Sequence, residues 1–188
     1  YLYCDCGQGP AVPYIGEGES YLASLQVAVV TVFGSMLLVY RSKMRWTMGS
    51  IFLFAGLIGW IVGGIGAVLD ATVAFNVDLH NTLWVPAHFH TYLLEGVVLF
   101  IFGWLVMLLE EGSREVLPAI VRWLTGLGVF GGGAVLLFGF YLAGAEGVPR
   151  RYAVEPPPGP EIAWWSTVGA VFVLIGVLVA AAEAVRLA

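Results

Sequence analysis

Charge is scarce in this sequence. Of its 188 residues only 11% are Asp, Glu, Lys or Arg, whereas 60% are hydrophobic. A water-soluble domain of this size cannot bury so much apolar surface, which excludes an ordinary soluble globular protein. The eight Lys and Arg residues form no basic stripe, which argues against nucleic acid as a partner. The sequence therefore predicts an integral membrane protein surrounded mainly by lipid.

Cysteine is scarce as well, with only Cys4 and Cys6. A Cys-x-Cys pair closes too small a ring for a relaxed disulfide, and two thiolates with no histidine nearby make a poor metal site. We expect ordinary thiols, with redox or metal chemistry as the lesser alternative. The chain begins at Tyr1 without a Met, a basic n-region or a cleavage pattern, so it does not begin like a signal peptide. We expect a processed product or a piece of a longer protein.

Apolar stretches long enough to cross a bilayer occur five times, separated by short polar or Gly/Pro-rich breaks. An extracytoplasmic segment at residues 1–19 is expected to precede them. The predicted fold is all-α, with residues 20–188 forming a five-helix transmembrane domain. The expected spans are about residues 20–40, 48–74, 86–109, 117–145 and 161–185.

Basic residues divide unequally between the two ends of these spans. The side that holds the loops after the first and third spans and the C-terminus carries six of them: Arg41, Lys43, Arg45, Arg114, Arg122 and Arg186. The opposite side carries only Arg150 and Arg151. Cytoplasmic loops are enriched in Lys and Arg, so we expect the first side to face the cytoplasm of a prokaryotic cell and the N-terminus to lie outside.

The chain has only three histidines, His80, His88 and His90, all near the outer end of the third span. Two positions along an α-helix correspond to about 200° of rotation, so His88 and His90 point to nearly opposite faces. They cannot chelate one metal ion together, but each can serve as the axial ligand of its own planar cofactor. Pro86 suits the first turn of this helix. The alternative is that these histidines hydrogen-bond to loops at the membrane surface.

Three motifs resemble subunit I of the haem–copper oxidases. "LHNTLWVPAHFH" resembles the haem-binding signature, in which a His-x-His on the tenth helix binds both haems. "GWIVGGIGAVLDA" resembles the ninth helix, and "GVPRRYAVEPPP" resembles the outer loop between the last two helices. The resemblance implies the last five helices of a twelve-helix fold. Asn81 and Pro86 look most like the B-type branch.

The resemblance implies a role for each matching residue. His88 would be the proximal ligand of the high-spin, oxygen-reducing haem, and His90 an axial ligand of the low-spin haem. His80 would lie near the haem propionates, with which Arg150 and Arg151 would pair. The arginine pair also suggests an anion on its own account, because it lies against the positive-inside bias and guanidinium matches carboxylate well. A solvated pair or a contact with lipid phosphate is the alternative.

The family's copper ion requires three further histidines and its low-spin haem one more, and this chain has none to spare. We expect copper at the shared site, ligated by residues outside this chain. The chain would then be part of a split or cleaved subunit or a piece of a longer one. The remaining N-terminal helices or a partner chain would complete it. A stand-alone relative that keeps haem without oxygen chemistry is the alternative.

Four further polar residues within or near the spans need a role. Glu95 follows His88 by seven residues, which on an α-helix is nearly the same face, about 10.5 Å further in. A buried carboxyl group is costly unless it is hydrogen-bonded, so we interpret Glu95 as a proton relay or, alternatively, as a structural partner of another helix. Thr31 and Ser35 share one face and are weaker proton-path candidates. Asp70 is expected to be a surface or propionate-region group.

The predicted function is therefore that of the C-terminal part of the catalytic subunit of a respiratory terminal oxidase. Electrons would pass from the low-spin to the high-spin haem, where oxygen is reduced to water with proton uptake. Subunit II, with its electron-accepting site, is an expected partner. The alternatives are a nitric oxide reductase of the same superfamily, with non-haem iron in place of copper, and a non-catalytic haem-binding or scaffold subunit.

Overall fold

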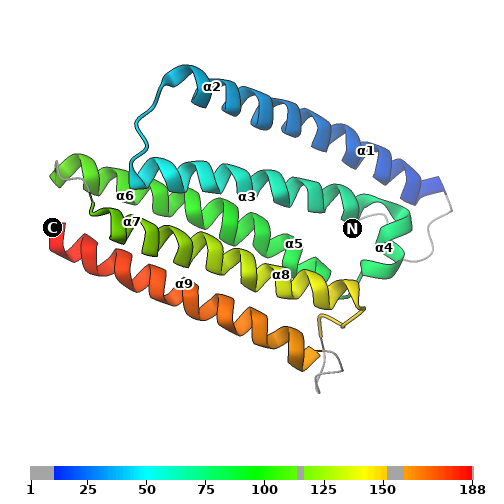
Figure 1. The fold of residues 1–188 in the computed structure, drawn as a ribbon. Coiled ribbons are helices and arrows are strands. Elements are labelled where there is room, and N and C mark those ends of the chain that lie inside the picture. The colour runs from blue at the N-terminus through cyan, green and yellow to red at the C-terminus, as the bar shows by residue number, and fades with distance from the viewer. Residues whose placement is uncertain (1–10, 114–116, 152–158, 188) are drawn as a thin grey trace.

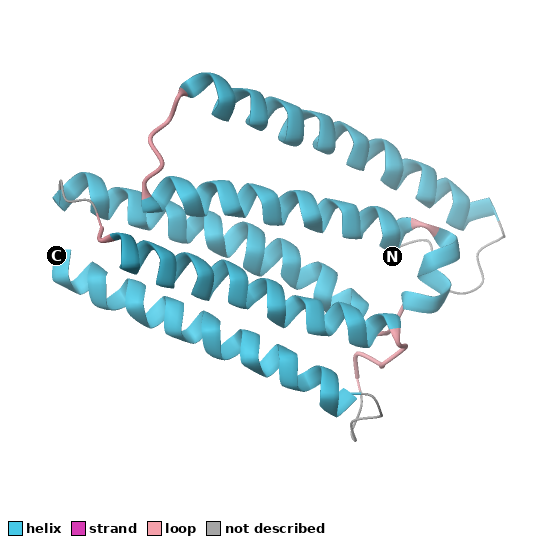
Figure 2. Ribbon diagram, viewed as in Figure 1, coloured by secondary structure: helices cyan, strands magenta, loops and turns pink. Residues whose placement is uncertain are grey.

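The structure, a computed structural model, describes residues 11–113, 117–151 and 159–187. Nearly every residue in these ranges is helical, and their only β-type pairing is an isolated bridge between Thr82 and Pro149 (Figure 2). Five helical rods are long and apolar enough to cross a membrane. The all-α, five-helix expectation is confirmed. Cys4, Cys6 and Arg114 lie outside the described residues.

The first rod consists of α1 (Ala11–Ala28), a π-helix η1 (Val29–Gly34) and α2 (Ser35–Ser42). It begins earlier than the expected position near residue 20, because polar residues extend the helix beyond its apolar part. Glu17 accepts a hydrogen bond from the Tyr21 hydroxyl one turn later, at 2.8 Å. The rod ends where Lys43 adopts a left-handed conformation with φ 47°. In Figure 1 this rod stands apart from the other four along most of its length.

The second rod is α3 (Met48–Ala71), followed by the short α4 (Val73–Leu79). Thr47 and Ser50 form a capping box at the start of α3. The carboxylate of Glu110 also accepts hydrogen bonds from the Met48 and Gly49 main-chain N–H groups, at 3.0 and 3.1 Å. A negative charge is favourable at this end of a helix, so Glu110 ties the third rod to the second.

The third and fourth rods each contain a π-helical segment between two α-helices. The third runs through α5 (Trp84–His90), η2 (Thr91–Val98) and α6 (Leu99–Ser113). The fourth runs through α7 (Ala119–Gly126), η3 (Leu127–Gly131) and α8 (Gly132–Ala145), and the fifth rod is α9 (Gly159–Leu187). π-Helical segments are rare and are found often at functional sites.

Glycines let the four tightly packed rods approach one another. A Cβ atom on Gly128 would lie 2.7 Å from the Cα of Gly176 in α9, and one on Gly63 would lie 2.8 Å from the Tyr92 ring. Lipid tails are as apolar as leucine, so close packing rather than hydrophobic burial holds such helices together. Most large apolar side chains of the first rod are exposed, as expected of a surface that faces lipid.

The two ends of the bundle carry different loops. In Figure 1, the end of α2, the start of α3 and the ends of α6 and α9 lie together, whereas α4 and the start of α9 lie at the other end. The basic residues therefore divide between the ends as the sequence predicted, with Arg41, Lys43 and Arg45 at one end and Arg150 and Arg151 at the other.

Candidate functional site

Helix α5 places His88 against α3. The ring packs so tightly that a Cβ atom on Gly66 would lie 2.8 Å from His88 Nδ1. Nδ1 is buried and makes no hydrogen bond to any described residue. Nε2 lies 3.9 Å from Asp70 Oδ2. That distance is too long for a hydrogen bond, so Nε2 does not form one with Asp70.

His90, the last residue of α5, has different surroundings. Its side chain is exposed, and its Nδ1 lies 2.7 Å from the main-chain oxygen of Pro86. A carbonyl oxygen only accepts hydrogen bonds, so Nδ1 carries the proton and Nε2 keeps its lone pair. This is the state of a histidine that is prepared to bind a metal through Nε2.

Aromatic and hydroxyl groups surround His88. The Tyr92 ring stands edge-on to the His88 ring, with centroids 5.2 Å apart, and contacts Trp60 on its other side at 4.9 Å. One turn before Glu95, the Thr91 hydroxyl lies 3.0 Å from the Tyr141 hydroxyl of α8. The third rod is therefore joined to the second by rings and to the fourth by a hydrogen bond.

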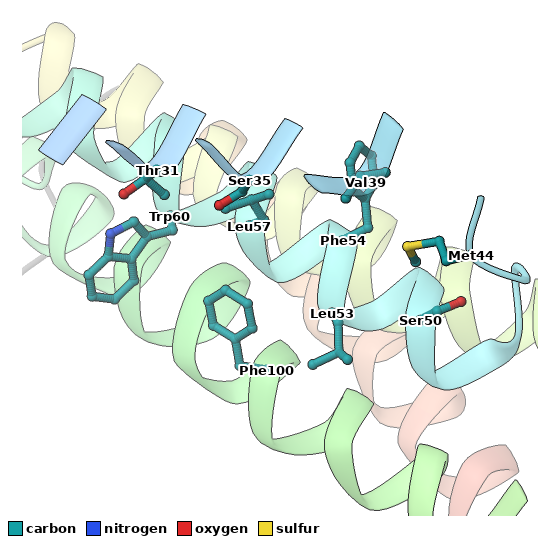
Figure 3. Close-up of a pocket in the computed structure, with 10 residues that line it drawn as sticks. All are labelled: Thr31, Ser35, Val39, Met44, Ser50, Leu53, Phe54, Leu57, Trp60 and Phe100. Carbon is teal, nitrogen blue, oxygen red and sulfur yellow. The ribbon is translucent and has the colours of Figure 1, made fainter. Parts of the chain in front are cut away.

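Two apolar cavities lie where the first rod stands off from α3. The larger has a volume of about 780 Å³, and its lining includes Tyr92, Trp60 and Thr31. The other, of about 610 Å³, is lined by Thr31 and Ser35 from the first rod together with residues of α3 and Phe100 (Figure 3). The structure thus places both hydroxyl residues of the expected proton path on cavity walls that are otherwise mostly apolar.

At the outer end, Asn81 brings His80 and Arg150 together. Asn81 has a positive φ of 67°, and its amide nitrogen lies 3.2 Å from His80 Nδ1. Its side-chain oxygen accepts a hydrogen bond from Arg150 Nη2 at 2.9 Å, and its main-chain oxygen accepts one from Arg150 N at 2.8 Å. Arg151 follows with an exposed side chain. The outer loop is therefore fixed next to the histidine segment.

Glu95 lies in the π-helical segment η2 and is only 4% exposed. Its Oε1 lies against the main chain of Gly133 in α8, while its own main chain lies against Gly59 in α3. The estimate of its position relative to His88 assumed a continuous α-helix. That assumption is wrong, because residues 91–98 form a π-helix, in which each residue turns the chain by a smaller angle.

Asp70 is a residue whose position the sequence reasoning missed. It lies in the last turn of α3, is only 6% exposed and faces His88, so the surface alternative is wrong, whereas the propionate-region alternative stays a prediction. Its position inside an apolar run was the available signal, because ionisable residues within spans are rare and usually functional. Tyr141 gave no comparable signal. Among the described residues, no three His, Cys, Asp or Glu side chains lie close enough to hold a metal ion together.

Comparison with known proteins identifies the family. Residues 2–179 match the family model described as Cytochrome C and Quinol oxidase polypeptide I. The chain is 32% identical to the cytochrome c oxidase subunit 1 of Thermus thermophilus over 157 residues, covering 79% of this chain and 27% of that protein. It is 29% identical to the probable quinol oxidase subunit 1 of Staphylococcus haemolyticus, covering 79% of this chain and 23% of that protein.

A solved structure shares the fold. It is a haem–copper terminal oxidase dimer determined by cryo-electron microscopy, with a TM-score of 0.75 and 22% identity over 99% of this chain and 38% of the matched chain. The chain thus spans about a quarter of the length of the curated relatives described above. With five membrane-spanning helices, the fold of a haem–copper oxidase and a family match over most of its length, this chain belongs to the cytochrome c and quinol oxidase polypeptide I family.

Proposed function

We propose that this chain is part of the catalytic subunit of a respiratory terminal oxidase and supplies one axial ligand to each of two haems. One observation carries the proposal. His88 and His90 lie one residue apart on α5 yet have different surroundings: His90 Nδ1 lies 2.7 Å from the main-chain oxygen of Pro86, whereas His88 Nδ1 is packed against Gly66 of α3. Each Nε2 is therefore the nitrogen left to bind iron.

His90 is proposed as the ligand of the low-spin haem. Its exposed side chain leaves room for a planar group, and its tautomer presents the Nε2 lone pair. A second ligand of this haem would come from residues outside this chain, because the other two histidines, His80 and His88, have other proposed roles. The residues around His90 are therefore compatible with a haem bound through Nε2.

His88 is proposed as the ligand of the high-spin haem. The cavity of about 780 Å³ has the size of a cofactor site, and Tyr92 in its wall touches the His88 ring. Apolar walls suit the macrocycle, and Gly64 keeps the α3 side of the cavity open. When bound, the haem irons would supply the electron transfer and the oxygen chemistry, while the chain orients them and tunes their potentials.

The outer loop is proposed to bind haem propionates. Asn81 contacts both Arg150 and His80. This cluster lies at the same end of the bundle as α5, the helix that carries His88 and His90. Arg151 is next in sequence and exposed. Guanidinium groups bind carboxylates through two parallel hydrogen bonds, so this cluster can fix the haem edge while the histidines fix the iron.

The remaining components are proposed to come from elsewhere in the assembly. Other helices of the subunit, or a partner chain, would supply the copper ligands, and subunit II would supply the electron-accepting site. The basic residues favour the cytoplasmic membrane of a prokaryote with the N-terminus outside. Thr31 and Ser35 would help to line a water route along the cavities of the first rod.

A reduced-minus-oxidised optical spectrum of the purified assembly, with and without carbon monoxide, tests this proposal. We expect a low-spin haem signal that carbon monoxide leaves unchanged and a high-spin signal that it shifts, together with oxygen consumption. Metal analysis should find copper. Non-haem iron in its place, with nitric oxide reduction, would replace the oxidase assignment by a reductase of the same superfamily. An intact assembly without haem would overturn the proposal.

A further inference from the structure

A carboxyl group is enclosed near the middle of the bundle. Glu95 lies eleven residues after Trp84 in a span of 30 residues, Trp84–Ser113, which places it well inside the bilayer core. Both carboxyl oxygens are buried and make no hydrogen bond to any described residue. Such a group is expensive in a membrane, and structures rarely retain one without a use.

Two glycines make the space for this carboxyl group. Any side chain at Gly133 would collide with Glu95 Oε1, and any side chain at Gly59 would collide with the main chain of Glu95. On each neighbouring helix the position that faces Glu95 is therefore a glycine. The carboxyl group is directed at the fourth rod, just beyond the π-helical segment η3 (Leu127–Gly131).

Further polar groups lie along the same rod on either side of Gly133. Thr125, eight residues earlier, is fully buried, and its hydroxyl has no described partner. Tyr141, eight residues later, contacts the Thr91 hydroxyl. Each interval is about two helical turns, on the order of 10 Å, a distance that a few hydrogen-bonded waters span. Thr125, Glu95 and the Thr91–Tyr141 pair form what we term the polar line.

The inner end of the polar line has space for water. Thr125 and Glu183 of α9 line a small cavity of about 20 Å³ that is otherwise apolar. A cavity of this volume holds one water molecule, and the two side chains provide polar partners for it. Glu183 also pairs with Arg186 in the last turns of α9, so charged groups lie at this end.

We propose that Glu95 is a proton-relay residue of this chain, loaded from the Thr125–Glu183 end and discharging toward the Thr91–Tyr141 pair. This inference rests on the proposed function, because an oxidase consumes protons at its high-spin haem. In each cycle the carboxylate accepts one proton from a water on its inner side and releases one to a water on its outer side. No electron or further reactant is involved. The route is distinct from the cavities lined by Thr31 and Ser35 at the first rod.

The test uses the complete assembly reconstituted in lipid vesicles, with three variants. Glu95→Gln removes the proton-carrying group at nearly constant size, and Glu95→Asp keeps an acid on a shorter arm. Glu111→Gln is the matched control, because Glu111 is an exposed carboxylate at the inner end of the same rod. Haem spectra, proton uptake during turnover and redox-induced infrared difference spectra in H₂O and D₂O are measured for each.

We expect Glu95→Gln to slow proton uptake at least tenfold with unchanged haem spectra, and to abolish an isotope-sensitive carboxylic-acid carbonyl band. Glu95→Asp should shift that band and slow uptake less, and Glu111→Gln should match the parent protein. If Glu95→Gln does not assemble, the band shift and slower uptake of Glu95→Asp carry the test.

Normal uptake and an unchanged infrared band in an assembled Glu95 variant with intact haem would overturn the relay and leave Glu95 a structural role, while the oxidase proposal stands. A parent assembly without haem would overturn both.

Discussion

The two faces of α5 differ in which groups surround their histidines. On the side of His88, this chain itself provides the surroundings: Gly66 and Asp70 of α3, the Tyr92 ring and, through Thr91, Tyr141 of α8. On the side of His90, the hydrogen bonds and ring contacts among the described residues are limited to the Pro86 main-chain oxygen and the ring of Phe89, which is itself 59% exposed.

This difference shows which parts of the site the chain can build alone. The surroundings of His88 consist of packed side chains from the described helices α3, η2 and α8. The surroundings of His90 must come from a cofactor, from lipid or from segments beyond this chain, which spans about a quarter of the length of the curated relatives it matches. Changes on the two sides should therefore have different consequences.

The largest effect is expected from closing the contact between α3 and the main chain of Glu95, in the π-helical segment that follows the two histidines. In Gly59→Ala the new methyl group collides with the main-chain carbonyl of Glu95, which cannot move without separating the second and third rods. Overpacking of this kind costs about 1–3 kcal/mol or more. Thermal unfolding in detergent should show a clearly lower midpoint. Gly131→Ala is the control, because nothing lies within 4 Å of a Cβ atom there. Equal midpoints for the two variants would contradict the packing described.

A smaller and more selective effect is expected from Asp70→Asn. Removing a negative charge 3.9 Å from His88 Nε2 should make reduction of the high-spin haem more favourable by roughly 1–2 kcal/mol. The reduction potential of this haem should therefore rise. The low-spin haem should change much less, because His90 lies on the other face of α5. Spectroelectrochemical titration measures both potentials, with the exposed Asp78→Asn as control. Equal shifts in the reduction potentials of the two haems would contradict the difference between the two faces of α5.

The smallest effect is expected at Asn81, which joins the outer loop to the histidine segment. Asn81→Ala places an ordinary side chain at φ 67°, which costs of order 1 kcal/mol and releases Arg150. Asn81→Gly spares the backbone and removes only the side-chain bonds. Unfolding midpoints should rank Asn81→Ala below Asn81→Gly, and both below the parent. An alanine variant as stable as the glycine variant would show that the positive φ carries no strain.

The sequence predicted the elements of this fold well because its strongest signals are long apolar runs. Five spans followed from the length of those runs. The family followed from three motifs: the histidine segment with His80 and His88, the glycine-rich stretch that begins at Gly59, and the outer loop with Arg150. The B-type branch and the haem-ligand roles stay predictions.

The direction of individual side chains was harder to predict, because it depends on local departures from α-helical geometry. The π-helical segment after His90 has no evident signature in its residues, yet it decides where Glu95 points. The burial of Asp70 depends on how α3 and α5 pack against each other. The hydrophobic pattern of one helix does not indicate which helix covers it. The link from Asn81 to Arg150 joins residues far apart in the sequence and needed the fold itself.

The most direct test of the account is to remove each histidine of α5 in turn and record the reduced-minus-oxidised spectrum with and without carbon monoxide. His90→Ala should lose the low-spin haem and keep the carbon monoxide-sensitive signal. His88→Ala should lose the carbon monoxide-sensitive signal and keep the low-spin haem. The account would be contradicted if both variants, correctly assembled, retained both signals, or if each lost the signal assigned to the other.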